Sequence, residues 1–291
     1  MRSKLLSLLL LIVILTSAAC TAQAPTAVSA TEAPAPTAVP PTLATTQAPV
    51  ENKTLTVLAA ASLTESFTEL GKMFEAQNPG VKVVFSFGGS QQLTQQLGQG
   101  AEADIFASAS KKYMDAAVEA KRVNKENIKT FAKNRLTVIF PKDNPAGLKE
   151  LKDLAKADLK LDLADKTVPV GQYSLDFLDK AVKDQAFGPQ FKDNVIKNVV
   201  SYEENVKSVL AKIVLGEADA GIVYVTDITA DTSEKVTRLD IPDALNTIAT
   251  YPIAPISDSK NADLAKAFVA LVLSPDGQAV MEKSGFIPAA P

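Results

Sequence analysis

The chain has 291 residues, with 30 lysines and arginines, 33 aspartates and glutamates, and a formal net charge of −3. It lacks the clustered basic excess that marks a nucleic-acid-binding surface, so no nucleic-acid partner is expected. It contains no histidine and one cysteine, so it lacks the commonest general base and soft metal ligands, which disfavours both an enzyme and a metal centre.

The N-terminus has the pattern of an export signal. Arg2 and Lys4 precede an apolar run from Leu5 to Leu15, and small residues follow up to Cys20. This order is typical of a secretory signal, and the run is shorter than the roughly 20 residues of a membrane span. We therefore expect a signal peptide over residues 1–20 and an exported protein.

Cys20 is the only cysteine, and it directly follows Ser17-Ala18-Ala19. This site resembles the lipobox of bacterial lipoproteins, although Ser17 stands where leucine is more usual. The resemblance implies that Cys20 is acylated and anchors the protein to the extracytoplasmic face of the cell membrane. The alternative is ordinary cleavage near Ala19.

Residues 21–51 consist mostly of alanine, proline, threonine, valine and glutamine. They include six prolines, and Glu32 and Glu51 are their only charges. A segment of this composition cannot bury a hydrophobic core. We expect residues 21–51 to be a disordered, extended tether.

After residue 51, strand and helix patterns alternate. Apolar side chains alternate along residues 81–87, which predicts a strand, and recur at helical spacing along residues 63–77, which predicts an amphipathic helix. Strands alternating with helices indicate an α/β chain with mostly parallel sheets. The other expected strands are 104–107, 135–140, 220–225 and 247–256, and the other expected helices are 111–120, from about 173, 206–214, 261–272 and 275–284.

Three strand-to-helix junctions carry the candidate binding groups. Ser62 stands three residues before Glu65 and fits a capping box, which is also its simplest structural explanation. Ser90 follows Gly88-Gly89, and residues 168–171 lead into another helix. In a sheet of parallel strands, ligands lie at such junctions, where helix N-termini attract anions.

No lysine, arginine or histidine occurs within residues 55–64, 85–93 or 167–175. The donors that these junctions offer are therefore uncharged, such as hydroxyl groups and backbone N–H groups. Neutral donors suit a small oxyanion that is bound and released unchanged. Hydrogen phosphate fits less well than a fully ionised dianion, because its proton needs an acceptor.

Six segments resemble the successive motifs of the periplasmic molybdate-binding proteins of ABC importers. The resemblance runs from about residue 55 to residue 286 and implies a two-lobed α/β periplasmic-binding-protein fold of type II, with the ligand in the interlobe cleft. The lobes would be 52–133 with 249–291, and 134–248. The segments are TVLAAASLTESF (56–67), VVFSFGGSQQL (83–93), GAEADIFASASKKYMD (100–115), TVPVGQYS (167–174), GIVY (221–224) and YPIA (251–254).

The same resemblance implies a ligand-binding set. Ser62 and Ser90 match serines that bind through hydroxyl and backbone N–H groups. Val170 and Val206 match residues that donate a backbone N–H, and alanine is common in the family where Val170 stands. Tyr224 matches a tyrosine whose hydroxyl donates to the ligand. Without the resemblance, both valines are ordinary helix-start residues and Tyr224 an ordinary core residue.

The resemblance thus implies a monomeric solute-binding protein, not an enzyme, that needs no cofactor. It would capture molybdate or tungstate outside the cytoplasm and deliver it to an ABC permease and its ATPase. The sequence does not decide between molybdate and tungstate. A protein for another oxyanion such as sulfate is the alternative, because sequence does not fix the radius of the cavity.

Overall fold

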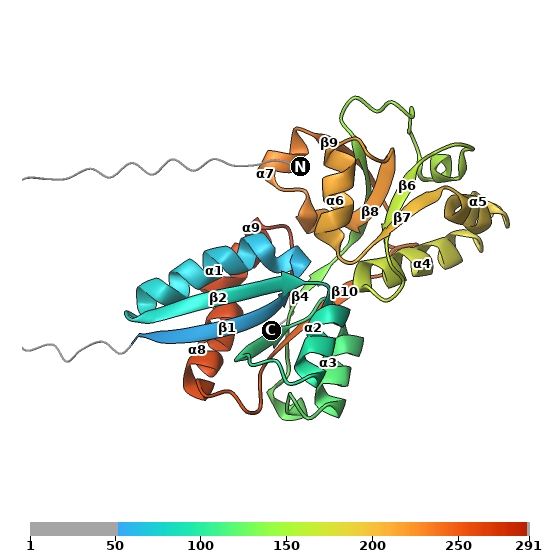
Figure 1. Ribbon diagram of the computed structural model, residues 1–291. Coiled ribbons are helices and arrows are strands. Elements are labelled where there is room, and N and C mark those ends of the chain that lie inside the picture. Colours follow the sequence, from blue (N-terminus) through green and yellow to red (C-terminus); the bar gives the residue numbers. More distant parts are fainter. Residues whose placement is uncertain (1–51, 290–291) are drawn as a thin grey trace, which may run out of the picture. The chain divides into compact units, whose positions relative to one another are not determined.

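The computed structural model describes residues 52–289, which form two mixed β-sheets with helices packed on them (Figure 1). Strands and helices alternate along the chain, so the predicted α/β class is confirmed. The predicted signal peptide (residues 1–20, with Cys20) and the predicted tether (residues 21–51) lie outside the described residues.

The first sheet has the strand order β11 (Ile287–Pro288), β4 (Lys129–Asn134), β10 (Ala249–Pro255), β3 (Ile105–Ala107), β1 (Lys53–Ala60) and β2 (Val81–Gly88). β1 is parallel to β2 and β3, whereas β10 is antiparallel to β3 and β4. The second half of β1 is completely buried, as expected for a central strand covered by helices on both faces.

The helices of this part are η1 (a 3-10 helix, Ala61–Leu63), α1 (Thr64–Gln77), α2 (Ser90–Gly98), α3 (Lys111–Glu119), η2 (Lys125–Asn127), α8 (Ala262–Leu273) and α9 (Pro275–Lys283). α1 packs on β2, α8 and α9, and α2 packs on β1 and α3. α1 buries Phe67 and Phe74, and both rings contact Phe268 of α8, with centroid distances of 6.0 and 5.4 Å. In the described part of the chain, no single helix is long and apolar enough to cross a membrane; α8 and α9 reach that length and hydropathy only as a pair bent by 61°.

The second sheet has the strand order β7 (Val199–Glu203), β6 (Leu161–Ala164), β8 (Ala220–Tyr224), β5 (Leu136–Pro141) and β9 (Val236–Asp240). Its helices are η3 (Leu151–Ala155), α4 (Pro169–Ala181), α5 (Phe191–Lys197), α6 (Val206–Val214), η4 (Val225–Asp227) and α7 (Ala230–Ser233). Both α4 and α6 pack on β8, and all five residues of β8 are buried. Tyr224 therefore lies at the end of a buried central strand.

The chain passes between the two sheets twice. β4 ends at Asn134 in the first sheet, and β5 begins at Leu136 in the second. β9 ends at Asp240, and β10 returns to the first sheet at Ala249. In the first sheet, β10 runs antiparallel to β3 and β4. In the second sheet, β5 runs antiparallel to β8 and β9.

The antiparallel strands at these two crossings explain why the prediction of mostly parallel sheets is wrong. Of the nine strand pairs among residues 52–289, five are antiparallel, and all of them involve β10, β4 or β5. Several short elements also escaped the sequence patterns, because half-exposed edge strands such as β7 have no strong apolar alternation. The helix expected from about residue 173 begins earlier, with Pro169 in its first turn, where proline is favoured.

Candidate functional site

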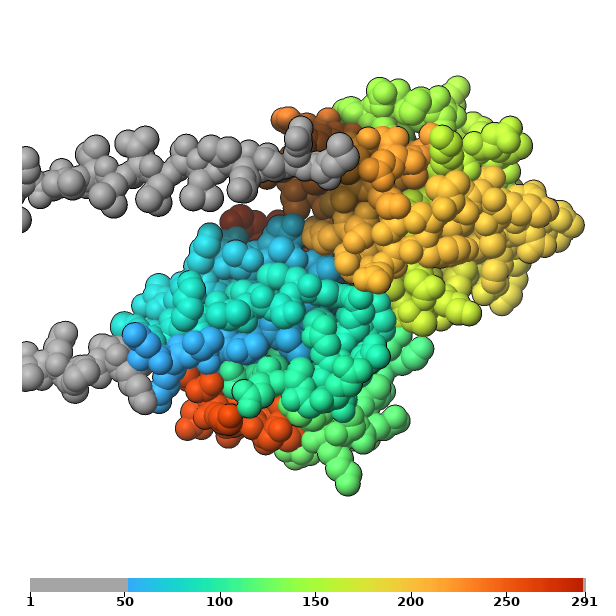
Figure 2. Space-filling model, in the orientation of Figure 1, coloured from blue at the N-terminus to red at the C-terminus, as the bar shows by residue number. Residues whose placement is uncertain are grey.

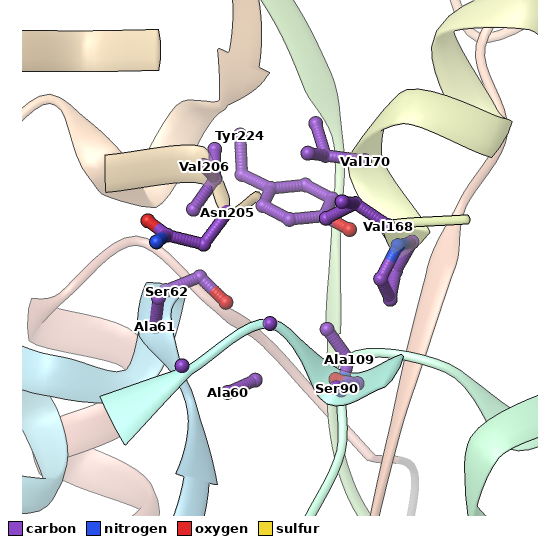
Figure 3. Close-up of a pocket in the computed structure, with 13 residues that line it drawn as sticks. Ala60, Ala61, Ser62, Ser90, Ala109, Val168, Val170, Asn205, Val206 and Tyr224 are labelled. Carbon is purple, nitrogen blue, oxygen red and sulfur yellow. The ribbon is translucent and has the colours of Figure 1, made fainter. Parts of the chain in front are cut away.

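A small cavity lies between the strand ends of the two sheets, and the empty space there, including the part open to solvent, is about 220 Å³. All five residues implied by the sequence resemblance line it, and Figure 3 shows the hydroxyl groups of Ser62 and Tyr224 pointing into this space. We call two groups of lining residues the first-sheet side (Ala60, Ala61, Ser62, Gly88, Gly89, Ser90 and Ala109) and the second-sheet side (Val168, Pro169, Val170, Asn205, Val206 and Tyr224).

Small residues at the ends of β1 and β2 let the two sides approach each other closely. A Cβ atom on Gly89 would lie 2.5 Å from the backbone oxygen of Glu204, so only glycine fits there. Glu204 also accepts hydrogen bonds from Gln91 and Gln92 of α2, each at 2.8 Å. In the space-filling view, the cyan surface from the first sheet meets the gold surface from the second (Figure 2). These contacts join the two sheets next to Gly89 of the cavity lining.

Ser90 begins α2 and is buried. The backbone N–H of Ala109 donates a hydrogen bond to Ser90 Oγ at 3.0 Å. A serine hydroxyl has one proton and two lone pairs. Because the protein uses a lone pair of Ser90 Oγ, the hydroxyl proton remains available to a ligand in the cavity.

Ser62 does not form the predicted capping box. The residue at the N-cap of α1 is Leu63, and Ser62 lies one residue earlier, inside η1. Its Oγ is instead 2.9 Å from the hydroxyl of Tyr251 in β10. The prediction is wrong because the chain inserts a 3-10 turn between β1 and α1, which carries Ser62 away from the first N–H groups of α1 and towards the cavity.

Val170 and Val206 lie at the starts of α4 and α6. The first four N–H groups of a helix have no partner within the helix. Asn205 caps α6 by accepting the N–H of Ser208 at 3.1 Å, which leaves the N–H of Val206 unused by this cap. The valine side chains are buried, so these residues can serve a ligand through their backbone.

Tyr224 ends β8, and only 1% of its surface is exposed. Its hydroxyl has no hydrogen-bond partner among residues 52–289. Burial raises the pKa of this phenol well above its usual value, so it keeps its proton. A buried hydroxyl without a partner is costly, and the cavity is the place where a ligand would satisfy it.

No charged side chain occurs among the described residues that line the cavity. The first residues of α2, α4 and α6 line it, and the N-terminus of a helix carries a partial positive charge. Within residues 52–289, no cluster of three or more Asp, Glu, His or Cys side chains could hold a metal ion. The arrangement can bind an anion through hydrogen bonds and helix dipoles.

One ion pair links the two sides next to the cavity. Lys207, which follows Val206, contacts Glu65 of α1 at 2.8 Å and the buried carboxyl of Asp227 at 3.4 Å. Asp227 also accepts the backbone N–H of Tyr224 at 2.9 Å. Burial raises the pKa of Asp227 to about 6, although the neighbouring Lys207 opposes this shift. A chain without histidine therefore still has a carboxyl that titrates near the site.

Sequence reasoning missed the groups that orient the two serines. Tyr251 and Ala109 both lie in segments of the family resemblance, but nothing in their spacing indicates a hydrogen bond to a serine. Asn134, which donates to Tyr251, lies in a strand that was not expected. These partners are far from the serines in sequence, and only the fold brings them together.

Comparison with known proteins identifies the family. The family model for bacterial extracellular solute-binding protein matches residues 55–287. The molybdate-binding protein ModA of Mycobacterium tuberculosis is 35% identical over 234 residues, which are 80% of this chain and 84% of that protein.

Two solved structures show the same fold. A substrate-binding domain assigned to a molybdenum ABC transporter of Clostridium difficile has 30% identity and a TM-score of 0.60, and the match covers 81% of this chain and 99% of that one. The sulfate-binding protein SubI of Mycobacterium tuberculosis has 20% identity and a TM-score of 0.72, with 82% and 88% covered. The predicted type II periplasmic-binding-protein fold is confirmed. The chain belongs to the bacterial extracellular solute-binding proteins, and the molybdate-binding protein ModA is among its relatives.

Proposed function

We propose that this protein captures molybdate in the cavity between its two sheets and delivers it to an ABC importer. The observation that carries the proposal is the set of neutral donors that meet there from both sides, with no charged side chain among the described lining residues. A fully ionised tetrahedral dianion has acceptors in every direction and needs no acceptor in return. The 35% identity to a protein named for molybdate binding selects molybdate among such dianions.

Each proposed ligand residue has one role. Ser62 and Ser90 donate their hydroxyl protons, Tyr224 donates its phenol proton, and Val170 and Val206 donate backbone N–H groups. Hydrogen bonds to a charged group contribute roughly 1.5–3 kcal/mol each, so five donors account for tight binding without a counter-charge. No step of bond making or breaking is involved, and we infer a binding protein without enzymatic activity or cofactor.

We propose that lobe 1 comprises residues 52–133 with 249–291, and lobe 2 residues 134–248, and that they close on the ligand by hinge motion. The strands support this division, because each sheet is built from one of these sets apart from Asn134 at the end of β4. The contacts of Glu204 with α2 and of Lys207 with Glu65 would form on closure.

The second candidate ligand is sulfate, which is also a fully ionised dianion. The similarity to the sulfate-binding protein SubI supports a shared fold, because only 20% of the residues are identical. Tungstate has the charge and shape of molybdate, so we expect it to bind the same donors. The choice between molybdate and sulfate depends on the width of the closed cavity.

Calorimetric titration of the purified protein with molybdate, tungstate, sulfate and phosphate tests the proposal. Molybdate and tungstate should bind tightly, sulfate far more weakly and phosphate weakest, with no chemical change in any anion. Sulfate or phosphate as the tightest ligand would show that the molybdate assignment is wrong.

We propose that Cys20 carries a lipid anchor and that the protein works as a monomer beside a permease and its ATPase. The support for the anchor is the position of the single cysteine directly after Ser17-Ala18-Ala19. Cell fractionation of a Cys20→Ala variant should find soluble or unprocessed protein. A variant that remains membrane-bound at its mature size would contradict the anchor.

A further inference from the structure

Three charged side chains join the two sheets beside the cavity. Lys207, in the first turn of α6, contacts Glu65 in the first turn of α1, and its Nζ is 2.8 Å from Oε1 and 2.9 Å from Oε2 of that carboxylate. The same Nζ is 3.4 Å from Oδ1 of Asp227 in η4. Glu65 belongs to the proposed lobe 1, and the other two residues belong to the proposed lobe 2. The cluster therefore crosses the boundary at which we propose hinge motion.

The two carboxyl partners of Lys207 differ in their exposure to water. The side chain of Asp227 is fully buried, whereas that of Glu65 is 46% exposed. A buried carboxylate that loses its cation is strongly destabilising. An exposed carboxylate that loses its cation is hydrated at little cost. Lys207 should therefore stay with Asp227 when the lobes separate, and Glu65 is the partner that leaves.

Lys207 stands at a position that is otherwise unfavourable for a cation. The N-terminus of a helix carries a partial positive charge, which repels a lysine in the first turn of α6. Burial lowers the pKa of Lys207, but the carboxyls of Asp227 and Glu65 outweigh burial, and the net shift of this pKa is upward. Lys207 is therefore charged, and its two carboxyl partners are what stabilises the charge there.

The cluster is connected to residues that we propose as ligand donors. Lys207 directly follows Val206, and Asp227 accepts the backbone N–H of Tyr224 at 2.9 Å. None of the three charged side chains is among the described residues that line the cavity. The cluster can therefore act on a bound anion only by holding the two sides of the cavity together.

We propose that Lys207 is a latch, which Asp227 keeps on the second-sheet side and which slows release of the bound anion by pairing with Glu65 when the lobes close. This inference rests on the proposed function and adds residues that do not touch the ligand. The contacts that Gln91 and Gln92 make with Glu204 use neutral amide donors. A pair of opposite charges with an exposed partner is weakened by salt, so the latch makes the release rate depend on ionic strength.

A double-mutant cycle on the dissociation rate of molybdate tests the latch. Glu65→Gln, Lys207→Met and the double variant are loaded with radiolabelled molybdate and chased with unlabelled molybdate. The chase is run at pH 8, above the pKa of about 6 to which burial raises Asp227. Glu65→Gln should raise the dissociation rate about three- to fivefold, as expected for a partly exposed ion pair. Beside Lys207→Met, it should have no further effect.

Glu69→Gln is the matched control. Glu69 lies one turn further along α1, is 44% exposed and pairs at 3.0 Å with Lys283 of α9, which packs on the same sheet side. This variant should release molybdate at the wild-type rate, because its ion pair does not cross between the lobes.

A salt series gives a second measurement that needs no Lys207 variant. It keeps the proposal testable if Lys207→Met, which leaves Asp227 buried without its cation, fails to fold. Raising the salt concentration from about 0.05 M to about 0.5 M should speed release from the wild type and from Glu69→Gln. Release from Glu65→Gln should change much less, because the pair that salt weakens is already absent.

Thermal unfolding distinguishes a latch from a local role of Glu65 in α1. Glu65→Gln should lower the unfolding midpoint of the molybdate-loaded protein more than that of the ligand-free protein. Equal lowering in both forms would show that Glu65 stabilises α1 alone, and would overturn the latch.

The remaining outcomes separate this inference from the proposed function. If Glu65→Gln releases molybdate at the wild-type rate, or has the same effect with and without Lys207, the latch is wrong while molybdate binding stands. If the wild-type protein binds no molybdate, the proposed function is wrong and the latch is overturned with it.

Discussion

The two sides of the cavity supply donors in different ways. On the first-sheet side, the donors are serine hydroxyls that already have a partner within the protein. Ser90 Oγ accepts the N–H of Ala109, and Ser62 Oγ shares a hydrogen bond with the hydroxyl of Tyr251. On the second-sheet side, they are backbone N–H groups at helix starts and the phenol of Tyr224, which has no partner within residues 52–289. The serines of the first-sheet side have partners within the protein, whereas the donors of the second-sheet side would gain theirs from the proposed ligand.

Buried carboxyls in the two sheets show the same contrast. Asp104, next to β3, accepts hydrogen bonds from the N–H of Thr56 at 2.7 Å and from the hydroxyl of Ser259 at 2.6 Å. Asp162 in β6 is equally buried, yet neither oxygen has a hydrogen-bond partner within residues 52–289. A buried polar group without a hydrogen-bond partner lowers the free energy of unfolding, so Asp162 should destabilise the second sheet more than Asp104 destabilises the first.

The largest effect on binding should come from Ser90→Ala. The substitution removes one donor to the ligand and also leaves the buried N–H of Ala109 without its acceptor. A hydrogen bond to a charged group contributes roughly 1.5–3 kcal/mol, so molybdate affinity should fall about 10- to 100-fold. Calorimetry measures this loss. Ser86→Ala, at an exposed position of β2, the strand that precedes α2, is the control and should bind like wild type.

Tyr224→Phe should weaken molybdate binding about tenfold while leaving the ligand-free protein as stable as wild type or more stable. The reason is that its hydroxyl has no partner within residues 52–289 until the ligand binds. Calorimetry and thermal unfolding without ligand check the two halves of this expectation. A clear loss of stability without ligand would mean that the hydroxyl has a partner in the free protein.

Asp162→Asn should change stability with pH rather than binding. Burial, reinforced by the nearby Glu203, raises the pKa of Asp162 to about 7 from an ordinary value of 3.8. Asp162 therefore binds more protons in the folded protein than in the unfolded chain in this window, so its contribution to stability falls as pH rises from about 4 to 7. The variant cannot ionise at this position, so its free energy of unfolding relative to wild type should increase over this pH range. Above pH 7 the difference should level off at a value on the order of 2 kcal/mol.

Urea unfolding at several pH values measures this difference. The control is Asp104→Asn in the first sheet, which loses hydrogen bonds that a carboxylate accepts and should be destabilised across the range. A wild-type stability that does not change between pH 4 and pH 7, relative to Asp162→Asn, would contradict the raised pKa.

The smallest effect should come from Val206→Ala. In the proposed site this residue would contribute only its backbone N–H at the start of α6, and the substitution keeps that group in place. Molybdate affinity should remain within about threefold of wild type, because only side-chain packing is lost. A loss as large as that of Ser90→Ala would show that the second-sheet side also depends on its side chains.

The main elements of the fold were predictable from the sequence where apolar periodicity is strong. The strand over residues 81–87 and the helix over residues 63–77 are observed within one residue of those ends. Short strands with half-exposed faces, such as β7, were not predicted. The antiparallel pairing of β10 with β3 and of β5 with β8 was not predicted either. Strand direction depends on where the chain crosses between sheets, and no local pattern encodes that path.

The candidate site shows the same limit. Family motifs placed the five proposed ligand residues at strand-to-helix junctions, and the structure brings all five to one cavity. The three-residue spacing of Ser62 and Glu65 predicted a capping box, and this capping box does not form. The observed partner of Ser62, Tyr251, is 189 residues away in sequence. Hydrogen bonds over such separations follow from the packed fold, so they could not be predicted from spacing.

A crystal structure of the protein with molybdate, with the metal located by its anomalous scattering, tests the central claim most directly. We expect one molybdenum position in the cavity, with its oxygens within hydrogen-bond distance of Ser90 Oγ and Ser62 Oγ on the first-sheet side. Tyr224 Oη and the N–H groups of Val170 and Val206 should contact it from the second-sheet side. A molybdenum position outside this cavity, or contacts from one side alone, would contradict the account.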